Sequence, residues 1–387
     1  MKLLNIVAVA GALAVAAGKQ VSGVFTSFDS LKYQKGANYP NITPATPSWV
    51  ATLSWSLDAA KVAPGDTFTL TLPCVFKFTT DSNTINLQAD GATYATCTLT
   101  GGEILVPYSS MQCTVTNQIS NVNLADGTVY FPLTFSVGGS ANLADLQNAN
   151  CFTAGTNTVT FKDGDKALST TVDFNGGSSN NQGIDSLNYN LKVLPSINTY
   201  QHYALAGNCP DGYSSGTLGI SGVNAVIDCS SVHAGITNDI NAWYYPKSSS
   251  SDFQFQASCS SNQYTITYSN IPAGYRPFID FLSTNPGVSL RTVYTDTFTC
   301  KNGRRTNDGL TRTWGSYNNG GTGSNGNVVK IVTLTWTGTT TGITTLPFST
   351  GPGNTQTVVV EVPVPTTTVT STWTGLCSSR SNRYCHR

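Results

Sequence analysis

The sequence predicts an all-β protein composed of β-sandwiches. Short runs rich in Thr, Val, Tyr and Phe alternate apolar and polar residues, as strands with one buried face do; examples are TPSWVATLSWSLD, TNTVTFKDGDKALSTTVDF and NQYTITYSNIP. Gly, Pro and Asn-Asp turns separate these runs, and no stretch sustains a helical apolar period; only ITNDINAW is a candidate short helix. Many short strands of this kind are typical of sandwiches.

Composition excludes several classes of protein. The formal net charge is +0 and only 10% of the residues are charged, so the chain lacks the electrostatic footprint of a protein that binds nucleic acid or an anionic membrane surface. The 39% of hydrophobic residues support a packed interior rather than disorder. The length of 387 residues suggests two or three domains.

The first twenty residues, MKLLNIVAVAGALAVAAGKQ, have the pattern of a secretory signal peptide. Lys2 precedes an apolar run, and small residues precede Lys19, where cleavage is expected. The alternative, a membrane anchor, is disfavoured because a spanning helix needs about 20 apolar residues. We therefore predict that residues 1–18 are a signal peptide and that the protein is secreted.

Ten cysteines in a secreted chain predict disulfides. No pair has CxxC spacing, so a zinc site is disfavoured, and the sequence alone does not choose among the many possible pairings. Cys377 and Cys385 lie in the C-terminal tail. The other eight are spread over the body of the chain: Cys74, Cys97, Cys113, Cys151, Cys209, Cys229, Cys259 and Cys300.

Two changes in composition divide the chain. FNGGSSNNQGIDS, from Phe174, separates the body cysteines into two sets of four, as expected for two disulfide-bonded sandwiches. NNGGTGSNG, at 318–326, is interpreted as a linker to a Thr-rich region, where TLTWTG recurs as TSTWTG. The predicted parts are the signal peptide and then domains at 19–188 and 189–318, a Gly/Thr-rich β segment at 319–350, and the start of a Thr-rich stalk repeat with an atypical tail at 351–387.

No enzyme is expected. GYSSG matches the nucleophile-elbow pattern with Ser214 as its serine, but strand-like sequence follows where that motif requires a helix. The chain has only three histidines and no HExxH, so a catalytic zinc is not expected, and His233 is interpreted as structural. Asp163 and Asp165 fit a hairpin in FKDGDKA, with Asp163-Gly164 in its turn, better than a calcium loop. We predict no metal and no cofactor.

One lysine stands out in FTLTLPCVFKFTT, at 68–80. We predict a single strand whose even positions, from Phe68 to Phe78, face a sandwich core, with Lys77 among the threonines on the other face. By pattern alone such a lysine is usually solvated. The alternative is that this face lines a cavity, where the ammonium would bind a ligand carboxylate.

Several long motifs resemble the N-terminal adhesive region of the agglutinin-like sequence (Als) adhesins of Candida-type yeasts. They are GVFTSFDSL, WSLDAAKVAPGDTFTLTLPCVFKFTT, YATC, CFTAGTNTVTFKDGDK, GYSSGTLG, IDCSSVHAGIT, IPAGYRPFID and SNG…TTLPF. The match runs in order from about residue 19 to about residue 350 and includes all eight body cysteines.

The resemblance implies two immunoglobulin-like domains of the kind found in bacterial surface adhesins. It also implies four disulfides, two in each domain. These are Cys74 with Cys151, Cys97 with Cys113, Cys209 with Cys300, and Cys229 with Cys259.

The resemblance further implies a groove between the domains that receives the flexible C-terminal end of a partner protein by strand addition. The lysine of the family's CVFKF-type motif, which pairs with the terminal carboxylate at the closed end, falls on Lys77. Other groove positions fall on Tyr39, Pro47, Trp49, Trp314 and Tyr317. The implied partners are protein C-termini and peptides of host surface and matrix proteins, and other adhesin molecules, and the implied role is cell adhesion and aggregation.

This sequence departs from the family's pattern within the groove. A small alanine beside the bound peptide falls on Thr134, and a groove arginine falls on Lys192, which cannot make planar two-pronged hydrogen bonds. Both changes affect peptide preference rather than the existence of the site. Asn41 begins the N-glycosylation sequon Asn41-Ile42-Thr43 and is therefore expected on a surface loop.

Two further departures lie near the C-terminus. The family's uninterrupted apolar β-run here is NVVKIVTLTW, in which Lys330 is expected to weaken amyloid-like self-assembly. The chain as written shows no hydrophobic tail for GPI attachment, so we expect secretion rather than anchoring. The alternative to a peptide-binding adhesin is a structural cell-wall protein whose sandwiches act only as spacers.

Overall fold

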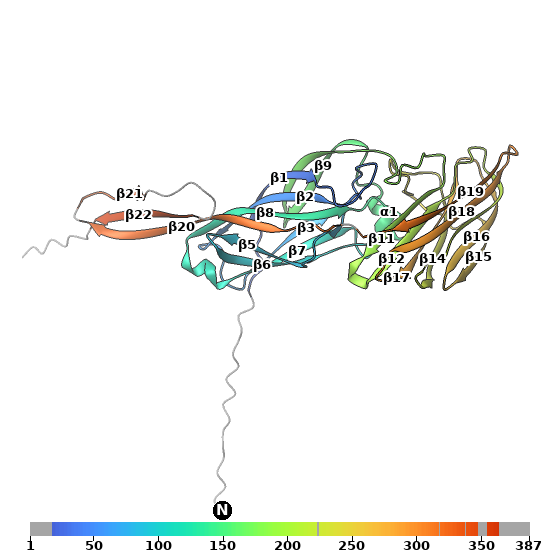
Figure 1. Ribbon diagram of the computed structural model, residues 1–387. Coiled ribbons are helices and arrows are strands. Elements are labelled where there is room, and N and C mark those ends of the chain that lie inside the picture. The colour runs from blue at the N-terminus through green and yellow to red at the C-terminus, as the bar shows by residue number, and fades with distance from the viewer. Residues whose placement is uncertain (1–17, 223, 317, 337, 347–353, 364–387) are drawn as a thin grey trace, which may run out of the picture.

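The protein is all-β: four sheets form two sandwiches, each with its own hydrophobic core (Figure 1). This computed structural model describes residues 18–222, 224–316, 318–336, 338–346 and 354–363. Each sandwich is of the immunoglobulin-like type, with two mostly antiparallel sheets packed face to face. The all-β prediction is confirmed.

The N-terminal sandwich packs a six-stranded sheet against a seven-stranded one. The first has the order β10-β9-β3-β7-β6-β5, with β3 (Thr67–Pro73), β5 (Thr84–Ala89), β6 (Ala92–Thr100), β7 (Tyr108–Val115), β9 (Gly155–Asp163) and β10 (Lys166–Phe174). The second has the order β1-β2-β8-β20-β22-β21, with β4 also paired to β8. Its strands are β1 (Phe25–Tyr33), β2 (Trp49–Asp58), β4 (Val75–Phe78), β8 (Leu124–Phe135), β20 (Gly323–Trp336), β21 (Gly342–Thr345) and β22 (Thr355–Pro363).

The C-terminal sandwich is smaller. Its four-stranded sheet has the order β11-β12-β17-β14 and its five-stranded sheet the order β15-β16-β13-β18-β19. The strands are β11 (Asn188–Leu194), β12 (Thr199–Leu205), β13 (Tyr213–Ser221), β14 (Ile227–Thr237), β15 (Gln254–Ser260), β16 (Gln263–Ile271), β17 (Arg276–Thr284), β18 (Leu290–Cys300) and β19 (Arg305–Trp314). The short helical turns in the described residues are η1 (Asn117–Asn121), α1 (Leu143–Asn148) and η2 (Pro195–Ile197).

The two sandwiches are in apolar contact. The N-terminal core takes in Tyr203 and Leu205 of β12 and Phe278 of β17, which belong to the C-terminal sandwich. Polar contacts at the same junction come from α1, which lies between the two sandwiches. The junction is therefore a packed interface rather than a loose linker, and a groove at its surface has well-defined walls.

The segment predicted as one strand at 68–80 is two strands in different sheets. β3 buries Phe68, Leu70 and Leu72, as the even-position pattern predicts. At Cys74 the backbone turns through a left-handed conformation, with φ of 64°, and β4 joins the opposite sheet. Val75 rather than Phe76 then packs in the core. The single-strand prediction is therefore wrong beyond Pro73, which lacks the N–H needed to continue a central ladder.

Of three other local predictions, one is confirmed with a shifted turn and two are wrong. The FKDGDKA hairpin is confirmed, but Asp163 pairs with Lys166, so the turn is Gly164-Asp165. The candidate helix ITNDINAW is wrong, because Ile240 is in a β-bridge with Pro246 and no helix is assigned there. The linker interpretation of 318–326 is wrong for Gly323–Gly326, which open β20 and pair with β8. The chain thus returns from the second sandwich to a sheet of the first.

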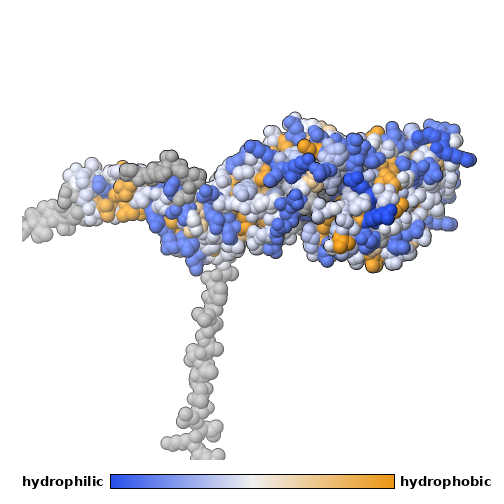
Figure 2. Space-filling model, viewed as in Figure 1, coloured by the Kyte–Doolittle hydropathy of each residue, from blue (hydrophilic) through white to orange (hydrophobic). Residues whose placement is uncertain are grey.

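Beyond the sandwich, β20 continues into an arm with β21 and β22 (Figure 1). Its apolar side chains are exposed there, including Ile331, Val332 and Leu334. Figure 2 shows hydrophobic residues at the surface of this arm. Lys330 is also exposed, in register with Thr357 of the parallel strand β22. The second copy of the repeated motif, TSTWTG with Trp373, lies outside the described residues, as do Cys377, Cys385 and the predicted signal peptide up to residue 17.

Candidate functional site: a groove between the sandwiches

A cavity of about 590 Å³ lies where the two sandwiches meet. Its walls come from the segment before β2, from β4 and β8 on one side, and from β11, β12, the 285–289 loop and the end of β19 on the other. Six of the eight predicted groove residues line it: Tyr39, Pro47, Lys77, Thr134, Lys192 and Trp314.

Of the other two predicted residues, the structure describes only Trp49, which does not line the cavity. Trp49 is buried in the N-terminal core, where its ring packs edge-on against Phe174 and its indole Nε1 donates to the Thr43 carbonyl at 3.1 Å. Tyr317 lies outside the described residues.

Lys77 is buried, with only 5% of its surface exposed. It is opposite Thr134 in the β4–β8 pairing, and its Nζ donates to the carbonyl oxygen of Val193 in β11 at 2.6 Å. Burial lowers the pKa of Lys77 to about 7; the Glu103 carboxylate opposes this shift and the Lys192 ammonium adds to it. Burial therefore disfavours the charged ammonium form of Lys77, and a negative charge added beside it would stabilise that form.

Glu103 joins the two sandwiches directly behind Lys77. It is 3% exposed, and its carboxylate accepts hydrogen bonds from the backbone N–H of Ser196, at 3.1 Å, and from the Ser196 hydroxyl. Ser196 lies in η2, immediately after β11. This contact fixes the end of β11 against the N-terminal sandwich, where Val193 meets Lys77.

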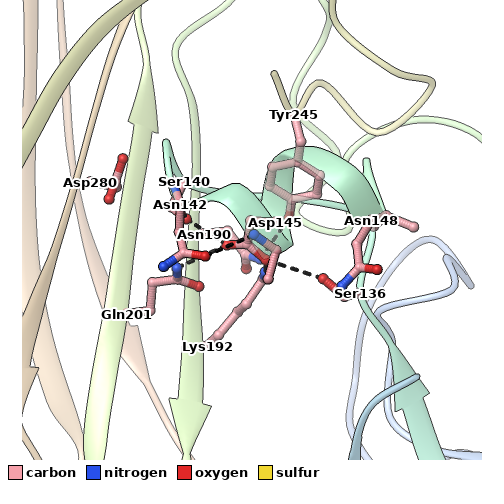
Figure 3. A network of polar contacts seen from close by, with 12 residues as sticks. Ser136, Ser140, Asn142, Asp145, Asn148, Asn190, Lys192, Gln201, Tyr245 and Asp280 are labelled. Carbon is pink, nitrogen blue, oxygen red and sulfur yellow. Dashed lines mark hydrogen bonds and ion pairs between the residues drawn. The ribbon is translucent and has the colours of Figure 1, made fainter. Parts of the chain in front are cut away.

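Lys192 is held by a polar network around Asp145 of α1 (Figure 3). Its Nζ is 3.1 Å from Asp145 Oδ1, and the two side chains are 9% and 0% exposed. Asp145 also accepts from Ser136 at 3.1 Å and Ser140 at 2.7 Å, both in the N-terminal sandwich, and from Gln201 of β12 at 2.9 Å. The buried Asp145 carboxylate thus accepts hydrogen bonds from both sandwiches. It also neutralises the charge of Lys192 inside the protein.

An aromatic wall, Tyr39 and Trp314, completes the lining on the side of β19. Trp314 Nε1 donates to Thr292 at 3.0 Å, and the Arg312 guanidinium lies 5.5 Å from the centre of the Trp314 ring. Burial raises the pKa of the Tyr39 phenol, and Arg312 opposes that shift. The wall offers apolar area with few titratable groups, which suits contact with varied side chains.

Four disulfides cross-link the chain, two within each sandwich. They join Cys74 to Cys151, Cys97 to Cys113, Cys209 to Cys300 and Cys229 to Cys259, the same pairs that the family resemblance implies. The first lies at the sheet switch next to β4 and therefore supports the segment that carries Lys77.

The other motifs have structural surroundings. Ser214 lies within strand β13 rather than on a strand-to-helix turn. His233 Nδ1 is 2.8 Å from Asp280 Oδ1, a hydrogen bond that raises the pKa of His233. Asn41 Nδ2 donates to the Ser178 carbonyl at 2.8 Å with one of its two N–H groups, which leaves the other for attachment of a glycan. Within the described residues no group of three His, Cys, Asp or Glu side chains could hold a metal ion.

Sequence reasoning missed Glu103 and Asp145. Asp145 could have been suspected from the Asn142 cap three residues before it, which indicates a helix start. Nothing local indicates that either carboxylate reaches the second sandwich, because their partners are 47 to 93 residues away in the chain.

Two disulfide-bonded immunoglobulin-like sandwiches with a groove at their junction define the class of this protein. In that setting, the family model described as "Agglutinin-like protein, N-terminal domain" matches residues 54–300. The chain is 45% identical to Agglutinin-like protein 4 of Candida albicans over 98% of its length, and 45% identical to Agglutinin-like protein 6 over 95%. The chain therefore belongs to the agglutinin-like (Als) family.

The chain spans only 43% and 27% of the length of these two relatives. Among solved structures, a serine-rich repeat protein (Srr2) of Streptococcus agalactiae aligns over 76% of this chain and 95% of its own, at 14% identity and a TM-score of 0.43. That likeness is too distant to support an argument about function. In the described part of the chain, no helix has the length and apolar character needed to cross a membrane.

Proposed function

We propose that this protein is a secreted or cell-surface adhesin whose groove binds the flexible C-terminal ends of partner proteins. The single observation that carries the proposal is the buried lysine, Lys77, in the wall of an inter-sandwich cavity. A terminal carboxylate is the one anionic group that every protein C-terminus shares. An ammonium placed to receive it would allow many partner sequences.

The walls of the groove favour an extended ligand. β11 is an edge strand that pairs with β12 in its sheet, and Leu191, Lys192 and Val193 of β11 line the cavity. An edge strand has backbone groups on one side available for a new partner. A peptide added alongside it would gain affinity from main-chain hydrogen bonds, which do not depend on sequence.

A rival role, a cell-wall spacer with no peptide site, makes the opposite prediction. The two roles are separated by screening the protein against a random peptide library displayed with free C-termini and against the same library attached through its C-termini. The proposal predicts enrichment only with free C-termini, lost in Lys77→Met and kept in Lys61→Met, an exposed lysine outside the groove. No enrichment, or equal enrichment in both formats, would support the spacer.

A further inference from the structure

Three charged residues line the groove within the described residues: Lys77, Asp81 and Lys192. The rest of the lining is neutral, and it includes the aromatic wall and the 285–289 loop. With so few charges in the lining, the sign and place of each decide which peptide side chains the groove favours.

Lys192 does not add a net charge to the groove. Its ammonium is 3.1 Å from the fully buried Asp145 carboxylate, which three further donors hold in place (Figure 3). A buried pair of opposite charges presents little net field to a ligand, and separating it would leave Asp145 uncompensated. Lys77 is the groove lysine to which the proposed function assigns the ligand carboxylate.

Asp81 has the opposite sign and lies at the open side of the groove. It is exposed, whereas Lys77 is buried, and its Oδ1 accepts a hydrogen bond from Asn319 Nδ2 at 2.6 Å. That amide is neutral, so the Asp81 charge is not cancelled by this partner. Asp81 is four residues after Lys77 in the chain. Four residues span at most about 14 Å even when fully extended, and β4 ends at Phe78, so the backbones at Lys77 and Asp81 are no farther apart than that.

We infer that the groove selects C-terminal peptides that carry a lysine or arginine within the last five residues before the terminal carboxylate. The inference rests on the proposed function, because it assumes that Lys77 holds that carboxylate. A peptide running from Lys77 toward Asp81 rises about 3.3 Å per residue, so it comes level with Asp81 no later than about its fifth residue from the end. A basic side chain there meets Asp81, and an acidic one is repelled.

The test uses N-acetylated Gly/Ala peptides with a free carboxylate, in which one Lys or one Glu is moved from the second to the seventh position from the C-terminus. Binding to the whole secreted chain is measured by calorimetry at low salt. We expect Lys to bind about threefold tighter than Glu at one or two adjacent positions no farther than the fifth, the scale of one solvent-screened ion pair. The preference should vanish in Asp81→Asn, which keeps the acceptor for Asn319.

Asp211→Asn is the matched control, since Asp211 is also an exposed aspartate that accepts from an asparagine, Asn302, at 2.7 Å. Its position scan should equal that of the wild type. A flat scan, a preference that survives in Asp81→Asn, or tighter binding of Glu next to the carboxylate overturns the inference while peptide binding stands. Absence of binding by every free-carboxylate peptide refutes the proposed function itself.

Discussion

Raising the pH from 6 to 8 should weaken peptide binding by removing the proton of Lys77. Burial lowers the pKa of this lysine to about 7 in the empty groove, while a peptide's terminal carboxylate stays ionised throughout the range. Only the protein molecules with a charged Lys77 are competent to pair with that carboxylate. Lysine loses its charge as the pH rises, so affinity must fall in that direction.

The size of the effect follows from the competent fraction. With a pKa of about 7, roughly nine in ten molecules are charged at pH 6 and roughly one in ten at pH 8. The apparent dissociation constant is the intrinsic constant divided by that fraction, so it should rise about tenfold over these two units. Lys77→Met should cost roughly 2–5 kcal/mol of binding free energy, as expected for truncating one side of a buried charge pair.

The assay is calorimetric titration of one free-carboxylate peptide at pH 6, 7 and 8 in buffers of different ionisation enthalpy, which reports the protons taken up on binding. Wild type should take up about half a proton at pH 7 and nearly one at pH 8. Lys61→Met should behave as the wild type does. A flat profile, an affinity that rises with pH, or the same slope in Lys77→Met would refute the reasoning.

Three further predictions concern stability and self-association. Asp296 is fully buried, and burial raises its pKa to about 7; the folded state then holds a proton that the unfolded state has lost, so stability falls as the pH rises from about 4 to about 7. In chemical denaturation, Asp296→Asn should remove this decline, and its free energy of unfolding at pH 7.5 should exceed that of the wild type by up to about 4 kcal/mol. An equal increase in the free energy of unfolding at pH 4 would contradict the explanation. Replacing Cys74 and Cys151 by alanine opens a loop with a sequence separation of 77 and should cost about 4.5 kcal/mol of unfolding free energy. The same change at Cys97 and Cys113, whose separation is 16, should cost about 3 kcal/mol, and the reverse order would argue against loop entropy as the cause. Lys330→Ile removes the one charge in NVVKIVTLTW and should increase thioflavin binding, and equal binding by the wild type would count against a protective role for Lys330.

The sequence pattern predicted strands well where one face is buried by neighbours in the same sandwich. The alternation in TPSWVATLSWSLD correctly places Trp49 on the buried face of β2 with Ala51 and Leu53, and the family resemblance alone suggested a groove position for it. The alternation in FTLTLPCVFKFTT failed after Leu72 because the chain changes sheets at Cys74. Periodicity describes one strand in one sheet and does not register such a switch.

The groove itself could not be predicted from local sequence. Lys77 has a pattern typical of a solvated lysine, and its burial depends on Val193, 116 residues further along the chain. The sequence predicts that Lys192 lacks the two-pronged hydrogen bonds of the family's arginine, but it does not reveal that the Asp145 carboxylate forms an ion pair with Lys192. Both results depend on how two sandwiches pack together, which is a non-local property that no spacing of residues encodes.

The most direct test of the central claim compares two forms of one peptide, differing only in a C-terminal carboxylate or carboxamide. Both are titrated against the secreted chain at pH 6.5, where Lys77 is mostly charged. We expect the acid to bind and the amide to lose roughly 2–5 kcal/mol of binding free energy, with no such difference in Lys77→Met. Equal binding of acid and amide by the wild type would contradict recognition of the carboxylate by Lys77.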